Sequence, residues 1–374
     1  MKKIMSDRRN AMADFLRNAG WAAAEVQALP GDASTRHYFR VAADGRRAML
    51  MDQPQHAETP PASANATAEE RHTLGYNAVA RLAGADCARF VAVAEFLQDR
   101  GLSAPEIHAV DCNAGFVLME DFGDRLYADI LSDGASEPEL YKAAVEALAH
   151  LHANAAPALI SSHVPLHSYD ETAQLAETAL LTDWYLPLAL NRKATAEETA
   201  EHRSLWRDLL ASMKDGDPAF VHRDYHAQNL LWLPEREGVA RVGLIDFQDA
   251  VAGSSAYDLV SLLEDARRDV SPELADAMVA HYISKMRAQG TPVDEVRLRA
   301  SLAIMAAQRN AKIAGIFARL QLRDGKPRYL DYLPRVWGYL ARDLEHPSLA
   351  PLKAWYERIL PRAAREGRIE GVAA

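Results

Sequence analysis

The chain carries HRDYHAQN at residues 222–229 and IDF at residues 245–247. In this stretch Asp224 precedes Asn229 by five positions, and a second acid, Asp246, follows downstream. Enzymes that transfer a phosphoryl group from ATP use one carboxylate to accept the proton of the attacking hydroxyl. They use an Asn amide and a second carboxylate to hold magnesium on the phosphates. The spacing therefore predicts a small-molecule kinase in which Asp224 is the base and Asn229 and Asp246 are magnesium ligands.

Short apolar runs surround this stretch. AFVH, LLWL and VGLI, all within 219–246, are separated by a loop and by the turn at 235–238. Apolar runs of this length suit strands better than helices. HRDYHAQN is therefore expected on a loop between short strands, with Asp246 at the end of the third strand. Rigid elements that hold a polar loop are where catalytic groups usually lie.

Three further side chains of the loop have different expectations. His222 is expected to pack beneath the loop as a structural residue, and His226 is predicted to contact the acceptor. Arg223 has two open interpretations, because it suits both a residue that steadies the loop and one that touches substrate.

The first third of the chain predicts a small sheet with few helices. Apolar alternation at 37–41, the Asp44-Gly45 hairpin signal and the run 48–51 predict two paired strands. Helices are expected at 7–20 and 85–100, where Gly20 and Gly101 stop them, and two more strands at 105–120.

After Asp121 the composition becomes rich in Ala, Leu and Glu, and long helical patterns dominate. They cover 137–154, 170–190, 196–214, 256–269, 272–288, 293–320 and 328–345. The chain is therefore expected to be an α+β protein of two lobes. Residues 1–120 would form a nucleotide-covering N-lobe, and residues 121–374 a C-lobe with the catalytic loop and the substrate-binding helices.

The segment GDASTRHYFRV, 31–41, lies where a kinase places its phosphate-covering hairpin. Ser34, Thr35 and Arg36 offer hydroxyl, backbone N–H and guanidinium donors to phosphate oxygens; a polar surface turn is the alternative. The following strand holds Met49 and Met51 but no Lys, although kinases usually carry there a Lys that pairs with the phosphates. Phosphate charge is then expected to be met by Arg36 or by magnesium alone, and weaker binding of ATP is the alternative. Glu95, on the helix at 85–100, would have no Lys partner and is expected to be a solvated helix residue.

The segment FVLMEDFGD, 116–124, leaves a predicted strand and enters the helical part, as a kinase hinge does. Met119, Glu120 and Phe122 are the predicted adenine contacts, through the Glu120 carbonyl and the Phe122 N–H. An ordinary exit from strand to loop is the alternative.

Two segments are predicted to bind the acceptor. On the helix 306–320, Arg309, Asn310 and Lys312 would line a substrate cleft, or else lie on a solvated face. Gln248 and Asp249 would bind substrate hydroxyls, or else cap the following turn.

Composition restricts the class of protein. The 374 residues carry a net charge of −10, which argues against a nucleic-acid partner. Two cysteines predict neither a disulfide framework nor a zinc site and fit a reducing compartment. Because no apolar run suits a signal peptide or a membrane span, a cytoplasmic protein with no membrane partner is expected.

HRDYHAQN, IDFQDAVAGSSAYDL and MEDFGD together resemble the aminoglycoside phosphotransferase-like kinases, which include choline, homoserine and sugar kinases. The resemblance spans nearly the whole chain. It implies a protein-kinase-like fold with a small antiparallel-sheet N-lobe and a large, mainly helical C-lobe. It also implies ATP and Mg²⁺ as cofactors, and it gives Asp224, Asn229, Asp246 and the hinge 116–123 the roles stated above.

GDASTRHYFRV, MDQP, IDFQDA and QRNAKIAGIFARL look most like the N-acetylmuramate/N-acetylglucosamine anomeric kinase branch of this family. That resemblance implies ATP-dependent phosphorylation of the anomeric hydroxyl of both sugars to the α-1-phosphate, in peptidoglycan recycling. The lactyl carboxylate of muramate would then pair with Arg309 or Lys312. The strand without a lysine departs from the wider family.

Two alternatives stay open at this point. Another small hydroxyl compound is the first, such as an aminoglycoside, another sugar or an amino alcohol, and acidic Asp249, Glu264 and Asp265 would suit a cationic one. A non-catalytic nucleotide-binding regulator is the second, and the missing strand lysine suggests it.

Overall fold

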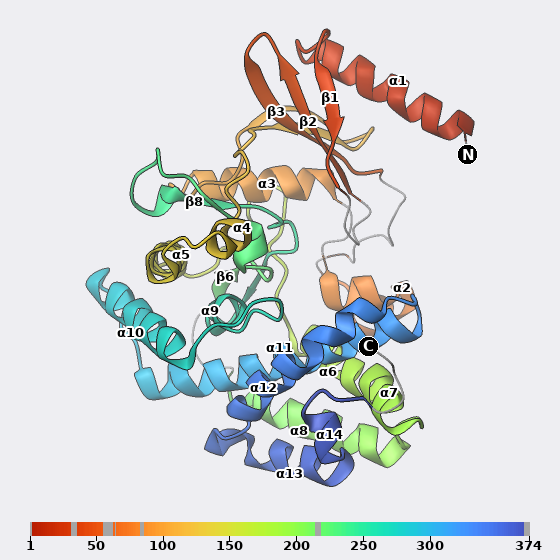
Figure 1. Ribbon diagram of the computed structural model, residues 1–374, viewed down its shortest axis with the longest axis vertical. Coiled ribbons are helices and arrows are strands. Elements are labelled where there is room, and N and C mark those ends of the chain that lie inside the picture. Colours follow the sequence, from red (N-terminus) through yellow and green to blue (C-terminus); the bar gives the residue numbers. More distant parts are fainter. Residues whose placement is uncertain are drawn as a thin grey trace. The chain divides into compact units, whose positions relative to one another are not determined.

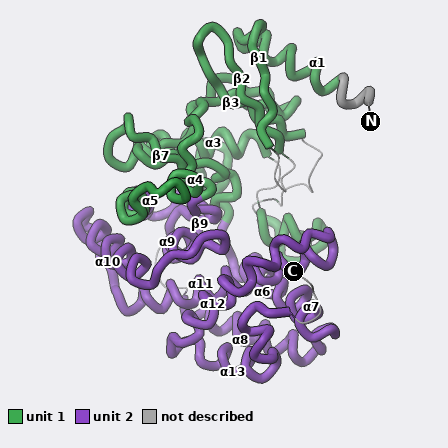
Figure 2. Tube along the Cα trace, in the orientation of Figure 1, with its two compact units in different colours: residues 1–143, 158–167, 228–250 green, residues 144–157, 168–227, 251–374 purple. Residues whose placement is uncertain are grey.

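A computed structural model describes residues 2–30, 36–54, 63, 65–82, 86–213 and 218–369, with side chains from residue 7 onward. The chain divides into two compact units (Figure 2). Unit 1 comprises 1–143, 158–167 and 228–250, and unit 2 comprises 144–157, 168–227 and 251–374. The catalytic-loop sequence passes from unit 2 to unit 1 after Ala227. The lobe boundary after residue 120 stays a prediction.

Unit 1 contains a five-stranded antiparallel sheet in the order β1-β2-β3-β5-β4 (Figure 1). Its strands are β1 (Glu25–Ala28), β2 (His37–Ala43), β3 (Arg46–Asp52), β4 (Ile107–Asp111) and β5 (Phe116–Met119). The predicted hairpin is confirmed. Asp44 and Gly45 have φ of 52° and 75°, which is the left-handed backbone that a tight two-residue turn requires.

Helix α1 (Lys2–Asn18) packs on one face of this sheet, as the apolar spacing of its sequence predicts. Phe15 and Leu16 lie against Ala48 and Leu50 of β3 and Phe116 of β5. Because side chains alternate along a strand, Met49 and Met51 point to the opposite face. The two faces of β3 are therefore distinct, and the apolar pair lies on the face away from α1.

Helix α3 (Cys87–Gln98) confirms the helix predicted at 85–100, and its Asp86 cap accepts from Ala88 N. Arg89 donates to the carbonyls of Gln248 (3.0 Å) and Pro165 (2.7 Å), and its third donor reaches the carbonyl of Ala250 at 2.5 Å. Phe90 stacks on Phe247 with ring centroids 4.9 Å apart. Helix α3 thus anchors the backbone that follows IDF.

The remaining helices and strands of unit 1 are short. It holds α2 (Ala68–Leu74), the π-helix η1 (Asn77–Arg81), α4 (Tyr127–Ser132) and the paired strands β7 (Leu230–Trp232) and β8 (Val242–Leu244). The thiol of Cys112, in the β4–β5 turn, lies 2.7 Å from that of Cys87.

Unit 2 is built around α11 (Glu295–Leu322), a helix of 28 residues that contacts α6 (Glu171–Leu180), α9 (Ala256–Leu263) and α12 (Leu333–Asp343). The predicted helix 170–190 is interrupted by the π-helix η2 (Leu181–Tyr185) and continues as α7 (Leu186–Leu190). Gly315 of α11 passes so close that an added Cβ would lie 2.4 Å from the Leu180 carbonyl carbon. Only a glycine permits this approach.

Two predicted helices are shorter than expected. The pattern 256–269 ends as α9 at Leu263, because Asp265 accepts from Arg267 N (2.9 Å) and turns the chain. The pattern 328–345 begins as a 3₁₀ turn, η5 (Pro327–Tyr332), before α12. The other elements are α5 (Glu137–His152), α8 (Ala196–Ala211), α10 (Pro272–Ala288), α13 (Ala350–Ile359), α14 (Arg362–Arg365), the 3₁₀ turns η3 (Ala227–Asn229), η4 (Gly238–Arg241) and η6 (Pro347–Leu349), and strands β6 (Ala219–Val221) and β9 (Val251–Gly253).

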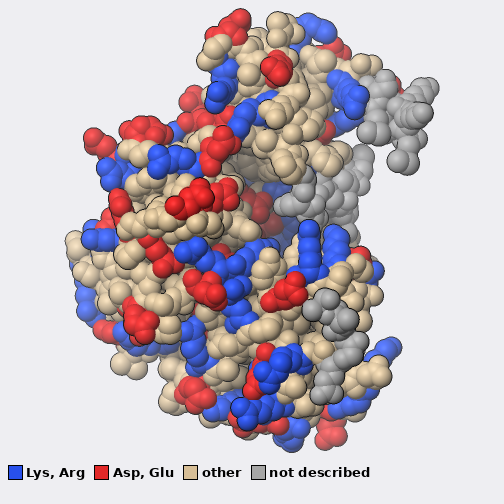
Figure 3. All heavy atoms as spheres, viewed as in Figure 1, with Lys and Arg blue, Asp and Glu red and all other residues tan. Residues whose placement is uncertain are grey.

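The α+β class predicted from the sequence is confirmed by this sheet and these helices. Across the described part of the chain, no helix is long and apolar enough to cross a membrane. Figure 3 shows basic and acidic side chains interspersed over the visible face, so the net charge of −10 is not gathered there in one acidic patch.

Candidate active site

The loop that carries Asp224 follows β6, which pairs antiparallel with β9 in unit 2. The carboxylate of Asp258, on α9, accepts from the backbone N–H of His222 (2.6 Å) and of Arg223 (2.9 Å). Arg223 has a φ of +76°, which a non-glycine residue adopts only when its surroundings hold it there. Asp258 therefore fixes the backbone immediately before Asp224.

Asp258 is fully buried, and this burial raises the pKa of its carboxyl to about 7. The two N–H donors oppose the shift because they favour the ionised form, whereas the nearby Asp224 adds to it.

Asp224 itself lies among cationic and ionisable groups. Burial works to raise the pKa of its carboxyl, but Lys312 above all, then His226, Arg223 and His222, hold that pKa below its ordinary value. The carboxylate is therefore ionised at neutral pH and able to accept a proton.

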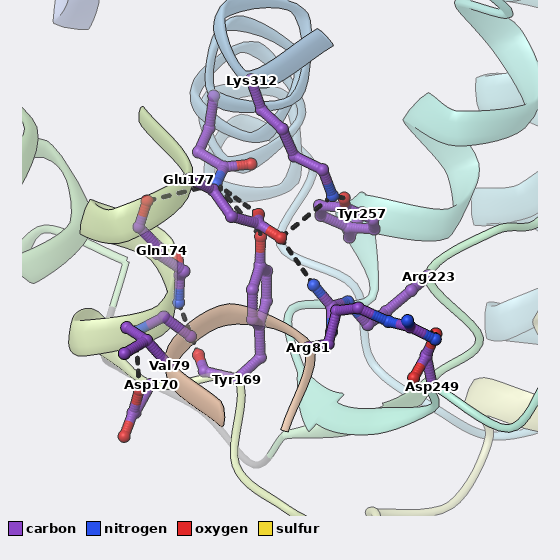
Figure 4. Close-up of polar contacts among 12 residues, drawn as sticks. Val79, Arg81, Tyr169, Asp170, Gln174, Glu177, Arg223, Asp249, Tyr257 and Lys312 are labelled. Atoms are coloured by element: carbon purple, nitrogen blue, oxygen red, sulfur yellow. Dashed lines mark hydrogen bonds and ion pairs between the residues drawn. The ribbon is translucent and has the colours of Figure 1, made fainter. Parts of the chain in front are cut away.

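Arg223 and Lys312 belong to a buried cluster of polar side chains (Figure 4). Glu177 Oε1 accepts from Arg223 Nη2 (2.6 Å) and from Lys312 Nζ (3.0 Å). Lys312 Nζ also donates to the Tyr257 hydroxyl at 2.9 Å. Arg223 was expected either to steady the loop or to touch substrate, and its contact with Glu177 shows that it steadies the loop.

The two loop histidines are both buried. The His222 ring meets Tyr225 edge-on at 5.6 Å, in agreement with the packing role expected for it. Burial lowers the pKa of His226 to about 4, so its imidazole is neutral at pH 7. Its contact with an acceptor stays a prediction.

Asn229 and Asp246 belong to unit 1, where they flank the β7–β8 hairpin. The Asn229 carbonyl accepts from Ile245 N (3.2 Å), which joins the two ends of the hairpin. Asp246 has a φ of +61°, again a left-handed backbone at a non-glycine residue. Its Oδ1 accepts from Gln248 Nε2 (2.9 Å) and from Arg36 Nη1 (3.1 Å).

The oxygen donors near Asp246 suit magnesium. The Asp246 side chain keeps 41% of its surface exposed, and the buried Gln248 Oε1 has no hydrogen-bond partner among the described residues. Hard oxygen ligands of this kind are those that Mg²⁺ prefers, usually with one or two carboxylates plus substrate phosphates. Within the described residues, no three His, Cys, Asp or Glu side chains gather to hold a metal.

Arg36 stands at the entry to β2 and is 6% exposed. Burial works to lower the pKa of its guanidinium, but the neighbouring Tyr38, Asp246 and Asp249 raise it further, so Arg36 is a permanent cation. Ser34 and Thr35, the other predicted phosphate contacts, lie outside the described residues.

Strand β3 carries no lysine at the place where kinases usually have one, as the sequence indicates. Met51 is fully buried on this strand, and Met49 is half-buried. Glu95 of α3 is exposed to solvent. It is therefore a solvated helix residue.

The predicted hinge begins where β5 ends. Glu120 N donates to the Glu106 carbonyl (2.8 Å), and the Glu120 carboxylate pairs with Arg236. The Arg236 guanidinium also lies 5.1 Å from the ring centroid of Phe122. The adenine contacts of Met119, Glu120 and Phe122 stay predictions. The Glu120 carbonyl and the Phe122 N–H are the atoms predicted to bind the adenine.

The α11 residues chosen as acceptor contacts do not form a solvated face. Arg309 is 6% exposed and donates to the Glu264 carbonyl (3.3 Å). Asn310 is fully buried and donates to Glu264 Oε2 (2.6 Å) and to Asp343 Oδ2 (3.1 Å). The solvated-face alternative is therefore wrong for both, and Asn310 is committed to two carboxyl groups.

Gln248 and Asp249 were expected either to bind substrate hydroxyls or to cap the following turn, and the structure gives each of them a side-chain partner. Gln248 contacts Asp246, and Asp249 Oδ2 accepts from Arg81 Nη2 at 2.8 Å within unit 1. Sequence reasoning missed Arg81, Glu177 and Asp258. Glu177 and Asp258 lie in ordinary helical patterns, where a buried acid carries no local signal, and Arg81 ends a π-helix that the sequence did not predict.

A comparison with protein-family models matches residues 25–301 to the phosphotransferase enzyme family. The chain belongs to this family. An N-acetylmuramate/N-acetylglucosamine kinase of Caulobacter vibrioides is 42% identical over 97% of this chain and 99% of its own length. Another kinase of the same name, from Pseudomonas aeruginosa, is 34% identical over 89% of each chain. The resemblance stated from the sequence is confirmed.

Solved structures share the fold of this phosphotransferase. A choline kinase from Streptococcus pneumoniae has a TM-score of 0.56 at 15% identity, covering 91% of this chain and 99% of its own. A microcompartment-associated aminopropanol kinase has a TM-score of 0.57 at 14% identity, covering 90% and 95%. At such identities the likeness concerns the fold, and it confirms the kinase-like architecture.

Proposed function

We propose that the protein is an ATP- and magnesium-dependent kinase of N-acetylmuramate and N-acetylglucosamine. It would phosphorylate the anomeric hydroxyl to give the α-1-phosphate, in peptidoglycan recycling and in the cytoplasm. The observation that carries this proposal is the 42% identity, over nearly the full length of both chains, to a kinase named for these two sugars. Asp224, Asn229 and Asp246, the residue types that phosphoryl transfer needs, are all present.

In the proposed reaction Asp224 accepts the proton of the sugar hydroxyl as its oxygen attacks the γ-phosphorus of ATP. An anomeric hydroxyl is more acidic than a simple alcohol, so a carboxylate of low pKa suffices as the base. The pKa of Asp224 is held below its ordinary value, so the carboxylate is ionised at neutral pH, as a proton acceptor has to be.

Asn229 and Asp246 would hold magnesium, which neutralises charge on the phosphates when bound. Arg36 supplies a second, permanent positive charge in unit 1, where the sheet lacks a lysine. We infer that Arg36 exchanges its contact with Asp246 for the phosphates of ATP. Ser34 and Thr35 are proposed as further phosphate donors on the strength of their sequence position alone.

The test is a panel of sugars, amino alcohols and aminoglycosides with ATP and magnesium, with ADP release as readout and phosphorus NMR of the product. A 1-phosphate of the two amino sugars is expected. Asp224→Asn should lower kcat by about three orders of magnitude or more, because the proton acceptor is lost. Asp133→Asn, an exposed Asp at the end of α4, is the control and should keep activity. Undiminished turnover by Asp224→Asn would show that another group is the base.

One of the acidic residues that would suit a cationic acceptor has a cation of its own. Asp249 is paired with Arg81, whereas Glu264 accepts from the neutral amide of Asn310 and Asp265 from a backbone N–H. The support that Asp249 would give to a cationic amino alcohol or aminoglycoside is therefore removed. A non-catalytic regulator is disfavoured by the complete set of Asp224, Asn229 and Asp246.

A further inference from the structure

The two cysteines of the chain, Cys87 and Cys112, lie in direct contact within unit 1. Cys87 is the first residue of α3, and Cys112 lies 25 residues later in the turn between β4 and β5. Both are free thiols, and their Sγ atoms are 2.7 Å apart. Two sulfur atoms at this separation need only a small approach to form a covalent bond. The fold therefore brings together the two partners that a disulfide needs.

Local contacts hold both thiols in place. At the start of α3, the Asp86 carboxylate accepts from a backbone N–H at 2.9 Å and caps the helix that begins with Cys87. In the β4–β5 turn, the Asp111 carboxylate accepts from Ala114 N, also at 2.9 Å. The Ala114 carbonyl in turn accepts from Arg8 Nη1 of α1 at 2.6 Å. The two sulfurs are thus presented by backbone that is fixed on both sides of the contact.

The two thiols differ in their access to solvent. Cys87 is 2% exposed, whereas Cys112 is partly exposed. A reagent in solution therefore meets Cys112 first, and Cys87 lies behind it as the second thiol. Burial is the largest cause that raises the pKa of both groups. Since the thiolate is the nucleophile, the pair should react slowly at neutral pH and faster at alkaline pH.

We propose that Cys87 and Cys112 are a modification site, at which a small disulfide such as oxidised glutathione oxidises them to an intramolecular disulfide. The Cys112 thiolate attacks one sulfur of the reagent, so that a mixed disulfide forms and one glutathione thiolate leaves. Cys87 then loses its proton to water, attacks the Cys112 sulfur and displaces the second glutathione thiolate. The two cysteines lose two electrons and two protons, and one glutathione disulfide becomes two thiols.

The bond would join α3 to the sheet of unit 1 without moving the helix. Helix α3 carries Phe90, which stacks on Phe247, and Arg89, which donates to two carbonyls of the segment after Asp246. Because the sulfurs already touch, closing the bond leaves these anchors in place, and kcat should stay the same. The cross-link restricts the unfolded chain between residues 87 and 112, so the oxidised protein should be the more stable form.

The first test counts thiols in the full chain. After incubation with excess oxidised glutathione at about pH 8.5, the native protein should fall from two free thiols to none, with residues 87 and 112 in one linked peptide by mass spectrometry. A reducing agent should restore both thiols. Between about pH 7 and about pH 8.5 the rate should rise about tenfold per pH unit, as the thiolate fraction does.

Matched variants remove one partner at a time. Cys87→Ala keeps the partly exposed thiol and should retain one glutathione as a stable mixed disulfide. Cys112→Ser keeps only the buried thiol, which should stay reduced under the same conditions. Oxidation should raise the melting temperature of the native protein by about 5 °C and leave that of Cys87→Ala/Cys112→Ser unchanged. Far-UV circular dichroism checks that every variant is folded.

Each outcome decides the inference. Two thiols that persist in the folded native protein after this treatment would overturn it, as would a link between two chains on a non-reducing gel or equal melting temperatures with and without the bond. A kcat more than a few-fold lower in the oxidised protein would contradict the undisturbed position of α3. The site is independent of the proposed function, because the thiol count and the melting temperature are not read through kinase activity.

Discussion

Arg36 Nη1 lies 3.1 Å from Asp246 Oδ1, so the guanidinium contacts the carboxylate proposed to hold magnesium. Both residues belong to unit 1, and Arg36 is almost fully buried. Under the proposed function, a cation fixed at this point would compensate for the lysine that β3 lacks. Magnesium and Arg36 would then compete for one oxygen of Asp246 until phosphates provide Arg36 with another partner.

We therefore expect Arg36→Met to raise the KM for ATP by about tenfold or more, because one charge-assisted hydrogen bond to phosphate is lost. Steady-state kinetics at saturating sugar measure this effect. Arg47→Met, an exposed residue of β3, is the control and should leave the KM for ATP unchanged. An unaltered KM in Arg36→Met would remove Arg36 from the phosphate site.

Arg309→Ala should raise the KM for N-acetylmuramate more than the KM for N-acetylglucosamine, because only the first sugar carries a carboxylate for the guanidinium to pair with. The two sugars are compared in parallel with one enzyme preparation. Arg299→Ala, an exposed residue of the same helix paired with Glu295, should affect neither sugar. Equal effects of Arg309→Ala on both sugars would contradict the assignment.

Asp343 makes stability depend on pH. Burial and the adjacent Glu264 raise the pKa of Asp343 well above its ordinary value, while Asn310 donates to both carboxyl groups. The folded pKa exceeds the unfolded value of about 4. The folded protein therefore binds this proton more tightly, and the stability that the proton provides is lost as pH rises through the folded pKa.

Asp343→Asn keeps the shape but cannot ionise, so its melting temperature should fall less than that of the native protein between pH 5 and pH 9. Thermal melts at matched ionic strength measure the two slopes. Asp276→Asn, on the exposed side of α10, serves for comparison and should retain the native slope. Parallel curves for the native protein and Asp343→Asn would show that the buried pair does not titrate in this range.

Gly315→Ala and Gly338→Ala form a contrasting pair on neighbouring helices. The added methyl at Gly315 would collide with the backbone of Leu180, so we expect a loss of about 1–3 kcal/mol in the free energy of unfolding. At Gly338, exposed on α12, nothing lies within 4 Å of the new Cβ, so Ala should stabilise by about 0.5–1 kcal/mol. Denaturant titration measures both. An unchanged free energy of unfolding in Gly315→Ala would show that α11 and α6 can move apart at little cost.

The sequence was informative where chemistry and local pattern coincide. HRDYHAQN was predicted on a loop between short strands, and it follows β6 and precedes β7. The β2–β3 hairpin was predicted because Asp44-Gly45 is a local signal. Strands β1 (EVQA) and β9 (VAG) were not predicted, because neither carries the run of large apolar residues that marked β6, β7 and β8.

Long-range partners escaped sequence reasoning for a physical reason. Glu177 is 46 residues from Arg223, and Asp258 is 35 residues from it, so no spacing rule joins them. A buried acid within a helix looks the same in sequence as a solvated one. The π-helix inside the predicted helix 170–190 was likewise hidden, because its apolar residues fit a regular helix equally well.

Arg89 donates to two carbonyls of the segment after Asp246, those of Gln248 and Ala250. Every amino acid presents a carbonyl, so the anchor is indifferent to which side chains the segment carries. The path of the backbone after Asp246 should therefore persist when Gln248 or Asp249 is replaced, whereas the side-chain contacts with Asp246 and Arg81 would be lost. The protein thus holds this backbone and positions the Asp246 carboxylate through two separate sets of contacts.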